Sequence, residues 1–260
     1  MNSTIEIVTV DVNNYEKSGF FCYKSKPKLE GCHSKQEWLQ QRFADGMRLK
    51  LIIENGRSVG FIEYTPGEYA WRAVNAPGYF VIHCLWVVGR SKQKGYGTRL
   101  LRECLQDARR LHKQGVVMIS SGGNWLADEE LFVRHGFKCV DTALPSFRLL
   151  VKNIEDGPLP SFPQNWEERL RRYPEGATIL YANQCPYMPD AVNGAVKALT
   201  ARGLDVKTVE LTSSADLQKF SPTPYGVFAV IYKGELISYH YLGKRELRQF
   251  DEEYSGTTAD

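Results

Sequence analysis

Residues 85–101 have the sequence LWVVGRSKQKGYGTRLL, in which a glycine-containing turn connects an apolar run to an amphipathic one. The run from Tyr79 to Val88 is apolar on both faces, which is typical of a central strand covered on both sides. After the turn, a helix is expected from about Tyr96 to Lys113 because its apolar residues recur on one stripe. The stripe consists of Leu100, Leu101, Cys104, Leu105, Ala108 and Leu111.

The turn itself carries the pattern of an anion site. Backbone N–H groups at a helix N-terminus have no partner within the helix and attract phosphate groups. Gly95 and Gly97 allow the backbone to approach a ligand closely, and Lys92 and Lys94 add positive charge. The G-x-G spacing matches neither the dinucleotide fingerprint nor the Walker pattern. From these residues alone, phosphate binding and a plain strand-to-helix turn both stay open.

The rest of the first part alternates between strands and helices, and Asn55-Gly56 between two apolar runs is a strong hairpin signal. This alternation predicts an α/β (α+β) domain with a mixed sheet. The expected strands are residues 49–54, 59–64, 116–120, 137–141 and 147–151, and the expected helices are residues 38–46 and 126–135.

The chain of 260 residues is long enough for two domains. Residues 155–165 are rich in proline and polar residues and are interpreted as a linker between residues 1–154 and residues 166–260. The second part also predicts a smaller α/β domain. Its expected strands are residues 178–182, 206–211, 227–232 and 235–240, and its expected helices are residues 191–202, a short one from 217, and 245–250.

Composition narrows the function classes. The chain has 33 Lys and Arg against 30 Asp and Glu, too nearly neutral to indicate a nucleic-acid partner. The longest apolar stretch is strand-sized and interrupted by His83, and the N-terminus lacks a secretory pattern, so neither a membrane span nor export is expected. The six cysteines form no C-x-x-C pair and no zinc spacing, which favours the cytoplasm, no disulfide framework and no metal.

Two motifs together resemble a known family. Residues 85–101 resemble the acetyl-CoA signature of the GNAT N-acetyltransferase superfamily, and residues 131–137, LFVRHGF, resemble its second signature. The resemblance covers roughly residues 1–154. It implies the GNAT mixed sheet flanked by helices, with acetyl-CoA as co-substrate and an amine as acceptor.

The resemblance also implies where acetyl-CoA lies. The pyrophosphate would sit on the amides of about residues 94–98, and the pantetheine arm would run beside residues 85–87 like an added strand. The Val87 amide would lie near the thioester carbonyl, where it could stabilise a developing oxyanion. Lys92 replaces the usual Arg or Gln, which keeps the charge and loses the planar geometry. The implied cofactor-binding residues are Leu85, Trp86, Val87, Lys92, Gln93, Lys94, Gly95, Tyr96, Gly97, Thr98 and Asn124.

Acetyl transfer to an amine requires a base, because an ammonium has no lone pair. His83 is the one ionisable group in the apolar central strand, and it resembles the strand histidine that some arylalkylamine acetyltransferases use as base. A core histidine bonded to neighbouring backbone is an equal alternative. Glu63 is the second candidate base, and its alternative is a solvated carboxylate at the end of a strand.

The general acid is not assigned. Phe132 occupies the position where many relatives have a Tyr, so water, Cys84 or a nearby Tyr would protonate the CoA thiolate, or it would leave unprotonated. Residues 64–75 read as a loop with Glu68, Tyr69, Trp71 and Arg72. These residues either form the wall of an acceptor pocket or pack on their own domain.

The second part resembles thioredoxin-like domains, with CPYM at residues 185–188 in place of the redox pair. Cys185 is expected at a helix N-terminus, where a thiolate is stabilised, although a structural thiol is an equal alternative. Met188 replaces the second cysteine, so dithiol chemistry is not expected. The SPTPY stretch at residues 221–225 is expected to hold a cis proline. The combination of the two domains resembles the YoaP-type acetyltransferases.

Three functions follow from these patterns. The first is an N-acetyltransferase in which a bound amine attacks acetyl-CoA directly, with His83 or Glu63 as base. The second is a thiol-dependent binding or redox protein that acts through Cys185, with a first domain that only binds CoA. The third is a CoA-binding protein without turnover. The acceptor, a small amine or a peptide, and the oligomeric state are not indicated by the sequence.

Overall fold

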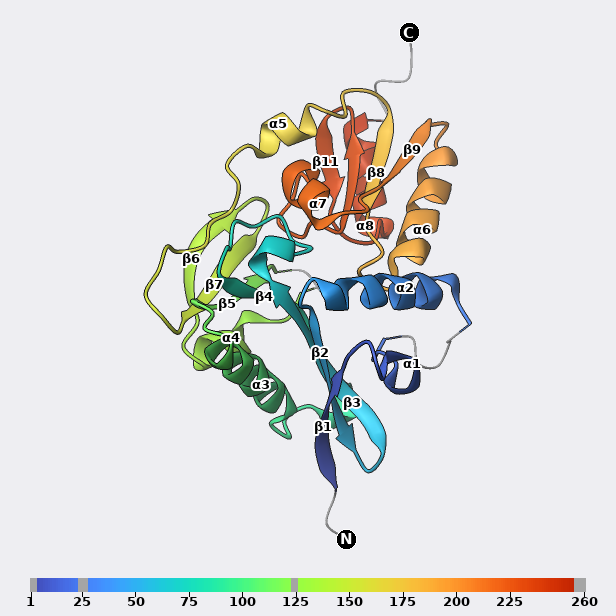
Figure 1. Ribbon diagram of the computed structural model, residues 1–260. Coiled ribbons are helices and arrows are strands. Elements are labelled where there is room, and N and C mark those ends of the chain that lie inside the picture. The colour runs from blue at the N-terminus through green and yellow to red at the C-terminus, as the bar shows by residue number, and fades with distance from the viewer. Residues whose placement is uncertain (1–3, 23–27, 123–125, 255–260) are drawn as a thin grey trace. The chain divides into compact units, whose positions relative to one another are not determined.

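The computed structural model describes residues 4–22, 28–122 and 126–254 of the chain (Figure 1). The chain forms two compact units, and the main division falls between Pro163 and Gln164. The short segment Trp71–Ala73 is grouped with the second unit. Within the described ranges, no helix combines the length and the apolar character needed to cross a membrane.

The first unit is built on a seven-stranded sheet with the order β1-β2-β3-β4-β5-β7-β6. All neighbouring strands are antiparallel except β4 and β5, which are parallel, so the sheet is mixed as the sequence predicts. Its strands are β1 Ile5–Val10, β2 Arg48–Glu54, β3 Arg57–Pro66, β4 Tyr79–Val87, β5 Gly115–Ser120, β6 Lys138–Ala143 and β7 Phe147–Asn153.

The predicted hairpin between β2 and β3 is confirmed. Asn55 and Gly56 both have positive φ angles, 52° and 73°, as the tight turn of a two-residue hairpin requires. The helices of this unit are α1 Tyr15–Ser18, α2 Glu30–Ala44, α3 Tyr96–Arg110 and α4 Glu129–Arg134. Short 3-10 turns, η1 and η2, cover Gly67–Tyr69 and Gly89–Ser91.

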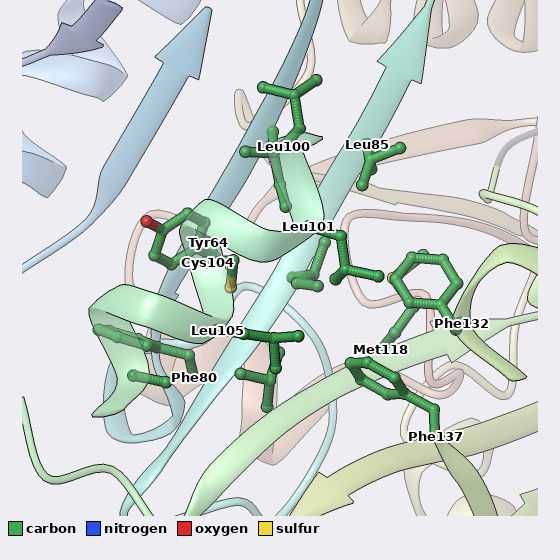
Figure 2. Close-up of a cluster of buried hydrophobic side chains, with 14 of the residues drawn as sticks. Tyr64, Phe80, Leu85, Leu100, Leu101, Cys104, Leu105, Met118, Phe132 and Phe137 are labelled. Carbon is green, nitrogen blue, oxygen red and sulfur yellow. The ribbon is translucent and has the colours of Figure 1, made fainter. Parts of the chain in front are cut away.

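Helix α3 packs its apolar stripe on strands β2 to β5. Five of the six predicted stripe residues are buried, and Figure 2 shows four of them packed with strand and α4 residues. The exception is Leu111, which is 40% exposed because the helix ends at Arg110 rather than near Lys113. The prediction of a longer helix is therefore wrong at its C-terminal end, and the prediction of its buried face is confirmed.

Strands β4 and β5 separate partway along their length. Their paired residues run from Tyr79↔Gly115 to Ile82↔Met118, although β4 continues to Val87. On the other side, β4 stays paired with β3 up to Val87↔Gly60. The register between β3 and β4 shifts by one residue, because Glu63 pairs with Cys84 and Tyr64 with Ile82. His83 is therefore the extra residue of a β-bulge, which bends the strand where the two strands part.

The second unit contains a four-stranded sheet with the order β11-β10-β8-β9. Strands β8 and β9 are parallel, and β10 is antiparallel to both β8 and β11. The strands are β8 Ala177–Tyr181, β9 Val206–Glu210, β10 Phe228–Tyr232 and β11 Glu235–Ser238, and the helices are α5 Trp166–Leu170, α6 Met188–Thr200, α7 Ser214–Phe220 and α8 Lys244–Tyr254.

The cis proline expected in residues 221–225 is absent. Among the described residues, the only cis peptide bond joins Leu144 and Pro145, so Pro222 and Pro224 are both trans. A proline-rich turn before a strand therefore forms here with ordinary trans peptides, which are the lower-energy form for any X–Pro bond.

Candidate functional site

The glycine turn places open backbone groups at the start of α3. Gly95 is the N-cap residue, with a left-handed φ of 76°, and no side chain caps the helix. Gln93 also has a positive φ, 65°, so the chain turns sharply twice within three residues. The N–H groups of Tyr96, Gly97 and Thr98 occupy the first turn, where no intrahelical acceptor exists. This is the arrangement that binds phosphate groups.

A cavity of about 1120 Å³ in the first unit opens at this turn. It has the size of a cavity that holds a large small-molecule ligand. The structure brings nine of the predicted cofactor-binding residues to its wall: Leu85, Trp86, Val87, Lys92, Gln93, Gly95, Tyr96, Gly97 and Thr98.

The opposite wall comes from residues that sequence reasoning did not identify. They lie at the end of β5 or just after it, in or beside α4, or on β7. They include Ser120, Ser121, Asp128, Glu129, Leu131, Arg134, His135 and Arg148. Only the resemblance of residues 131–137 to the second family signature could have indicated part of this wall.

Two of the predicted cofactor-binding residues differ from the other nine. The Lys94 ammonium lies 2.9 Å from a Glu54 carboxylate oxygen, and its side chain is not part of the cavity wall. Lys94 therefore pairs with Glu54 in this structure, and its place among the cofactor-binding residues stays a prediction. Asn124 lies outside the residues that the structure describes.

The separated edge of β4 presents backbone donors to the cavity. The Val88 N–H donates to the Val59 carbonyl of β3 at 2.9 Å. Because N–H groups alternate in direction along a strand, the amides of Leu85 and Val87 point the other way, toward the side where β5 has left. In the described part of the chain, the β4–β5 ladder stops at Ile82 and Met118, so no strand occupies this side.

His83 belongs to a buried cluster of charged side chains, here called the histidine cluster, formed by Lys35, Glu63 and His83. The Lys35 ammonium lies 2.6 Å from one Glu63 oxygen, and His83 Nδ1 lies 3.3 Å from the other. The three residues are at most 3% exposed. The Lys35 ammonium also lies 4.1 Å from the centre of the Trp38 ring, on the same helix α2.

The electrostatics of the cluster bear on the candidate base Glu63. Burial alone would raise the pKa of Glu63, but the charges and hydrogen bonds of Lys35 and His83 outweigh it and lower the pKa to about 2. Glu63 is therefore ionised at neutral pH and is a poor base. The alternative prediction of a solvated carboxylate is wrong, because Glu63 is 1% exposed. A carboxylate in this position can accept a hydrogen bond from His83 Nδ1–H and orient the ring.

Phe132 has no chemical role in the structure. It is fully buried beside α3, and its ring packs edge-to-face on Phe137 at a centroid distance of 5.3 Å. The residue that stands in the usual place of an acid is thus part of the hydrophobic core shown in Figure 2. Cys84, one of the alternatives that the sequence leaves open beside water and a nearby Tyr, is half-buried on β4.

The loop between β3 and β4 contains the 3-10 turn η1 and several buried residues. Glu68 accepts a hydrogen bond from the Gly78 N–H at 2.8 Å, which ties the two ends of the loop together. Trp71 and Arg72 are buried and are grouped with the second unit, whereas Tyr69 is 46% exposed. Glu68 is therefore engaged within its own loop rather than placed to attract an acceptor.

Cys185 does not lie within the first turn of its helix. Helix α6 begins at Met188 with Tyr187 as its N-cap, and the Met188 N–H donates to the Cys185 carbonyl at 3.0 Å. The Cys185 side chain is half-buried. It therefore occupies a turn just before α6, and the predicted position at the helix N-terminus is shifted by two residues.

In the first unit, the separated strands β4 and β5 and the uncapped start of α3 border one cavity. Residues 12–137 match the family model described as the acetyltransferase (GNAT) family. Over residues 12–137 the chain is therefore similar to GNAT acetyltransferases, and it is an acyl-CoA-dependent acetyltransferase.

The similarity to one curated protein extends beyond this domain. The chain is 29% identical over 241 residues to the uncharacterized N-acetyltransferase YoaP of Bacillus subtilis (strain 168). The match covers 90% of this chain and 94% of that protein, so both units are included.

Among solved structures, the chain is similar to the PaiA N-acetyltransferase of Thermoplasma acidophilum in complex with coenzyme A. The identity is 17%, the match covers 58% of this chain and 99% of that one, and the TM-score is 0.42. A GNAT acetyltransferase of Brucella melitensis in complex with acetyl-CoA is also 17% identical, with 62% and 94% covered and a TM-score of 0.40.

Proposed function

We propose that the protein transfers the acetyl group of acetyl-CoA to the amine of a small molecule or peptide, by direct attack in a ternary complex. The observation that carries this proposal is the cavity at the place where β4 and β5 separate, here called the β4–β5 fork. In this cavity the uncapped start of α3 and the open edge of β4 form parts of one wall. The helix start suits the diphosphate, and the strand edge suits the amide groups of the pantetheine arm.

The Val87 amide supports the proposed chemistry at the thioester. When the amine nitrogen attacks the carbonyl carbon, a C–N bond forms and the carbonyl oxygen becomes negative before the C–S bond breaks. A backbone N–H that already points into the cavity stabilises that charge without reorganising. CoA then leaves as a thiolate, which takes a proton from water because the Tyr position is occupied by the buried Phe132.

His83 is proposed as the base that removes the proton of the attacking amine, directly or through one water. Glu63 is ionised and can only accept, so the proton between them lies on His83 Nδ1 and the basic lone pair lies on Nε2. The role of Glu63 is then to orient the base rather than to act as one. Lys35 keeps Glu63 ionised by its direct ion pair.

The second unit is proposed to be thioredoxin-like. The support is its sheet, in which a parallel pair, β8 and β9, is joined through α6 and followed by the antiparallel β10 and β11. With a single cysteine in the CPYM stretch, a binding role is favoured over dithiol exchange.

The experiment is an acceptor screen that follows thiol release from acetyl-CoA, after calorimetry has established that acetyl-CoA binds. The panel contains small primary amines, peptides with free N-termini, lysine peptides and aminoglycosides. We expect thiol release only with an acceptor and in equal amounts with the acetylated amine. A burst of thiol equal to the enzyme concentration without acceptor would indicate an acyl-enzyme and contradict direct attack.

Two variants separate this proposal from a thiol-dependent protein. Gly97→Trp fills the helix start, because a Cβ at Gly97 already lies 3.3 Å from Leu131. Cys185→Ser removes the thiol of the second unit. Loss of turnover in Gly97→Trp alone supports the transferase, whereas loss of function in Cys185→Ser alone supports the thiol protein.

A further inference from the structure

Alternate residues of strand β2 point toward helix α3. They contact the body of the helix and the glycine turn that precedes it. Lys50, Ile52 and Glu54 share one face of the strand, because side chains two apart point the same way. The Lys50 ammonium contacts Asp107 at 3.1 Å and Glu103 at 2.9 Å, both on α3. Ile52 is fully buried in the core beneath α3. Glu54, the last residue of β2, contacts the glycine turn instead of the helix body.

The Glu54 carboxylate accepts hydrogen bonds from residues along the whole turn. Lys94 Nζ donates to its two oxygens at 2.9 and 3.2 Å, and the Tyr96 hydroxyl donates at 2.7 Å. The Ser91 hydroxyl donates more weakly, at 3.4 Å. Ser91 ends the turn η2 and Tyr96 begins α3. One carboxylate therefore connects the beginning, middle and end of the segment 91–96.

The conformation of the segment 91–96 requires stabilising contacts from outside the segment, because one of its residues has an unfavourable backbone angle. Gln93 has a positive φ, which costs energy for any residue other than glycine. Tyr96, the first residue of α3, is 3% exposed, and its side chain belongs to the hydrophobic core. The hydrogen bonds from Tyr96 and Lys94 lower the pKa of Glu54 below its ordinary value, so the carboxylate stays ionised at neutral pH.

We propose that Glu54 is a positioning residue, which holds the segment 91–96 in the shape that presents the amides of α3 to the diphosphate of acetyl-CoA. The inference rests on the proposed binding of acetyl-CoA at this turn. It assigns Lys94 a structural role, because the Lys94 ammonium forms an ion pair with Glu54 although the Lys94 side chain is 47% exposed. Glu54 touches no ligand in this scheme and acts only through the turn.

The test measures the dissociation constants of CoA and of 3′-phosphoadenosine 5′-diphosphate by calorimetry, for the wild-type chain and Glu54→Gln. We expect both constants to rise about tenfold, because the lost hydrogen bonds act at the diphosphate. Once an acceptor has been identified, we expect KM of Glu54→Gln for acetyl-CoA to rise by a similar factor, while kcat changes little. An unchanged constant for the nucleotide fragment overturns the proposal.

Glu103→Gln is the matched control. It also removes a carboxylate between β2 and α3, the partner of Lys50 at 2.9 Å, but it lies away from the turn. We expect its dissociation constants to equal those of the wild type. If Glu103→Gln weakens CoA as much as Glu54→Gln does, then general loosening of α3 explains the effect and the proposal is wrong.

A second pair of variants tests how Lys94 acts. If Lys94 works through Glu54, Lys94→Met and the double variant Glu54→Gln/Lys94→Met weaken CoA binding no more than Glu54→Gln alone. If Glu54→Gln instead tightens binding by releasing Lys94 to the phosphates, the proposal is overturned. Should Glu54→Gln fail to fold, Tyr96→Phe removes one of the same hydrogen bonds and keeps the buried ring, and we expect a several-fold weaker affinity.

The failure of this inference and the failure of the proposed function give different results. A wild-type chain that binds neither CoA nor the nucleotide fragment contradicts the proposed function. A wild-type chain that binds both, together with a Glu54→Gln variant that binds equally well, contradicts the positioning role alone.

Discussion

The first unit contains two buried ion clusters that look alike and differ in one chemical respect. The histidine cluster joins Lys35, Glu63 and His83 on one side of the sheet. The second cluster, here called the tyrosine cluster, consists of Lys50, Tyr64 and Asp107. In it the Tyr64 hydroxyl donates to Asp107 at 2.5 Å, and the Lys50 ammonium lies 3.1 Å from the same carboxylate.

In both clusters a lysine and a second donor keep a buried carboxylate ionised. Burial would raise the pKa of Asp107, but Tyr64 and Lys50 outweigh it and lower the pKa, as Lys35 and His83 do for Glu63. The third members differ. Burial and the neighbouring Cys104 and Asp107 raise the pKa of Tyr64 far above its ordinary value, so its hydroxyl stays protonated at neutral pH.

The position of each cluster matters as much as its chemistry. His83 is the bulge residue at the point where β4 leaves β5, next to the strand edge that faces the cavity. Tyr64 lies in the core beneath α3, and Asp107 is a buried residue of α3 itself. A buried charge by itself therefore marks no active site, and of these two clusters only the histidine cluster lies where β4 and β5 separate.

His83→Ala should show the largest effect of the variants in these clusters. We expect kcat to fall about a thousandfold, which is within the usual contribution of a general base, while the dissociation constant for acetyl-CoA stays the same. Steady-state kinetics with the identified acceptor and calorimetry with acetyl-CoA measure the two quantities. A variant with wild-type kcat would show that His83 is a structural core histidine.

Asp107→Asn should affect stability rather than chemistry. The substitution leaves the Lys50 ammonium in the core with only the partly exposed Glu103, so the free energy of unfolding should fall by about 2 to 3 kcal/mol. Urea denaturation measures this change. The folded protein should keep its kcat; a loss of kcat comparable with that of His83→Ala would remove the distinction between the two clusters.

The pH dependence of the free energy of unfolding should show the contribution of the ionised Glu63 carboxylate. The pKa of Glu63 is lowered from 4.5 to about 2, so its stabilising effect is complete above about pH 4.5 and is lost as the pH falls toward 2. Glu63→Gln should therefore be less stable than the wild type at pH 7, and the difference should shrink at pH 3. Urea midpoints at both pH values measure it, and a constant difference would contradict the ion pair.

Tyr64→Phe should have the smallest effect. It removes one hydrogen bond to Asp107 and keeps the ring that packs on Phe80 at 5.1 Å, so we expect a loss of about 1 to 2 kcal/mol of stability. The acetyl transfer rate should be unchanged. A strongly reduced rate with normal folding would place the tyrosine cluster in the chemistry after all.

The strand, the glycine turn and the helix could be predicted from residues 79–113 because each has a local signal. The apolar run, the two glycines and the helical stripe depend on neighbours in sequence, and so does the Asn55-Gly56 hairpin. The fork of β4 and β5 could not be predicted in the same way. It depends on register between strands, and the bulge at His83 leaves no mark in the amino-acid pattern.

The residues that complete the site were missed because they act over long distances in sequence. Lys35 is 28 residues from Glu63, and it lies on the first half of α2, ahead of the helix that the sequence indicates. Its one signal is its place three residues before Trp38, on the buried face of α2. Glu54 gives no signal at all, because the contact with Lys94 spans 40 residues.

Calorimetry of acetyl-CoA with the wild-type chain and with Gly97→Trp tests the central claim most directly. The open helix start and the strand edge predict one molecule of acetyl-CoA bound per chain, with binding lost in Gly97→Trp and retained in His83→Ala. Absence of heat with the wild type, or equal affinity in Gly97→Trp, would contradict the assignment of the acyl carrier to the fork.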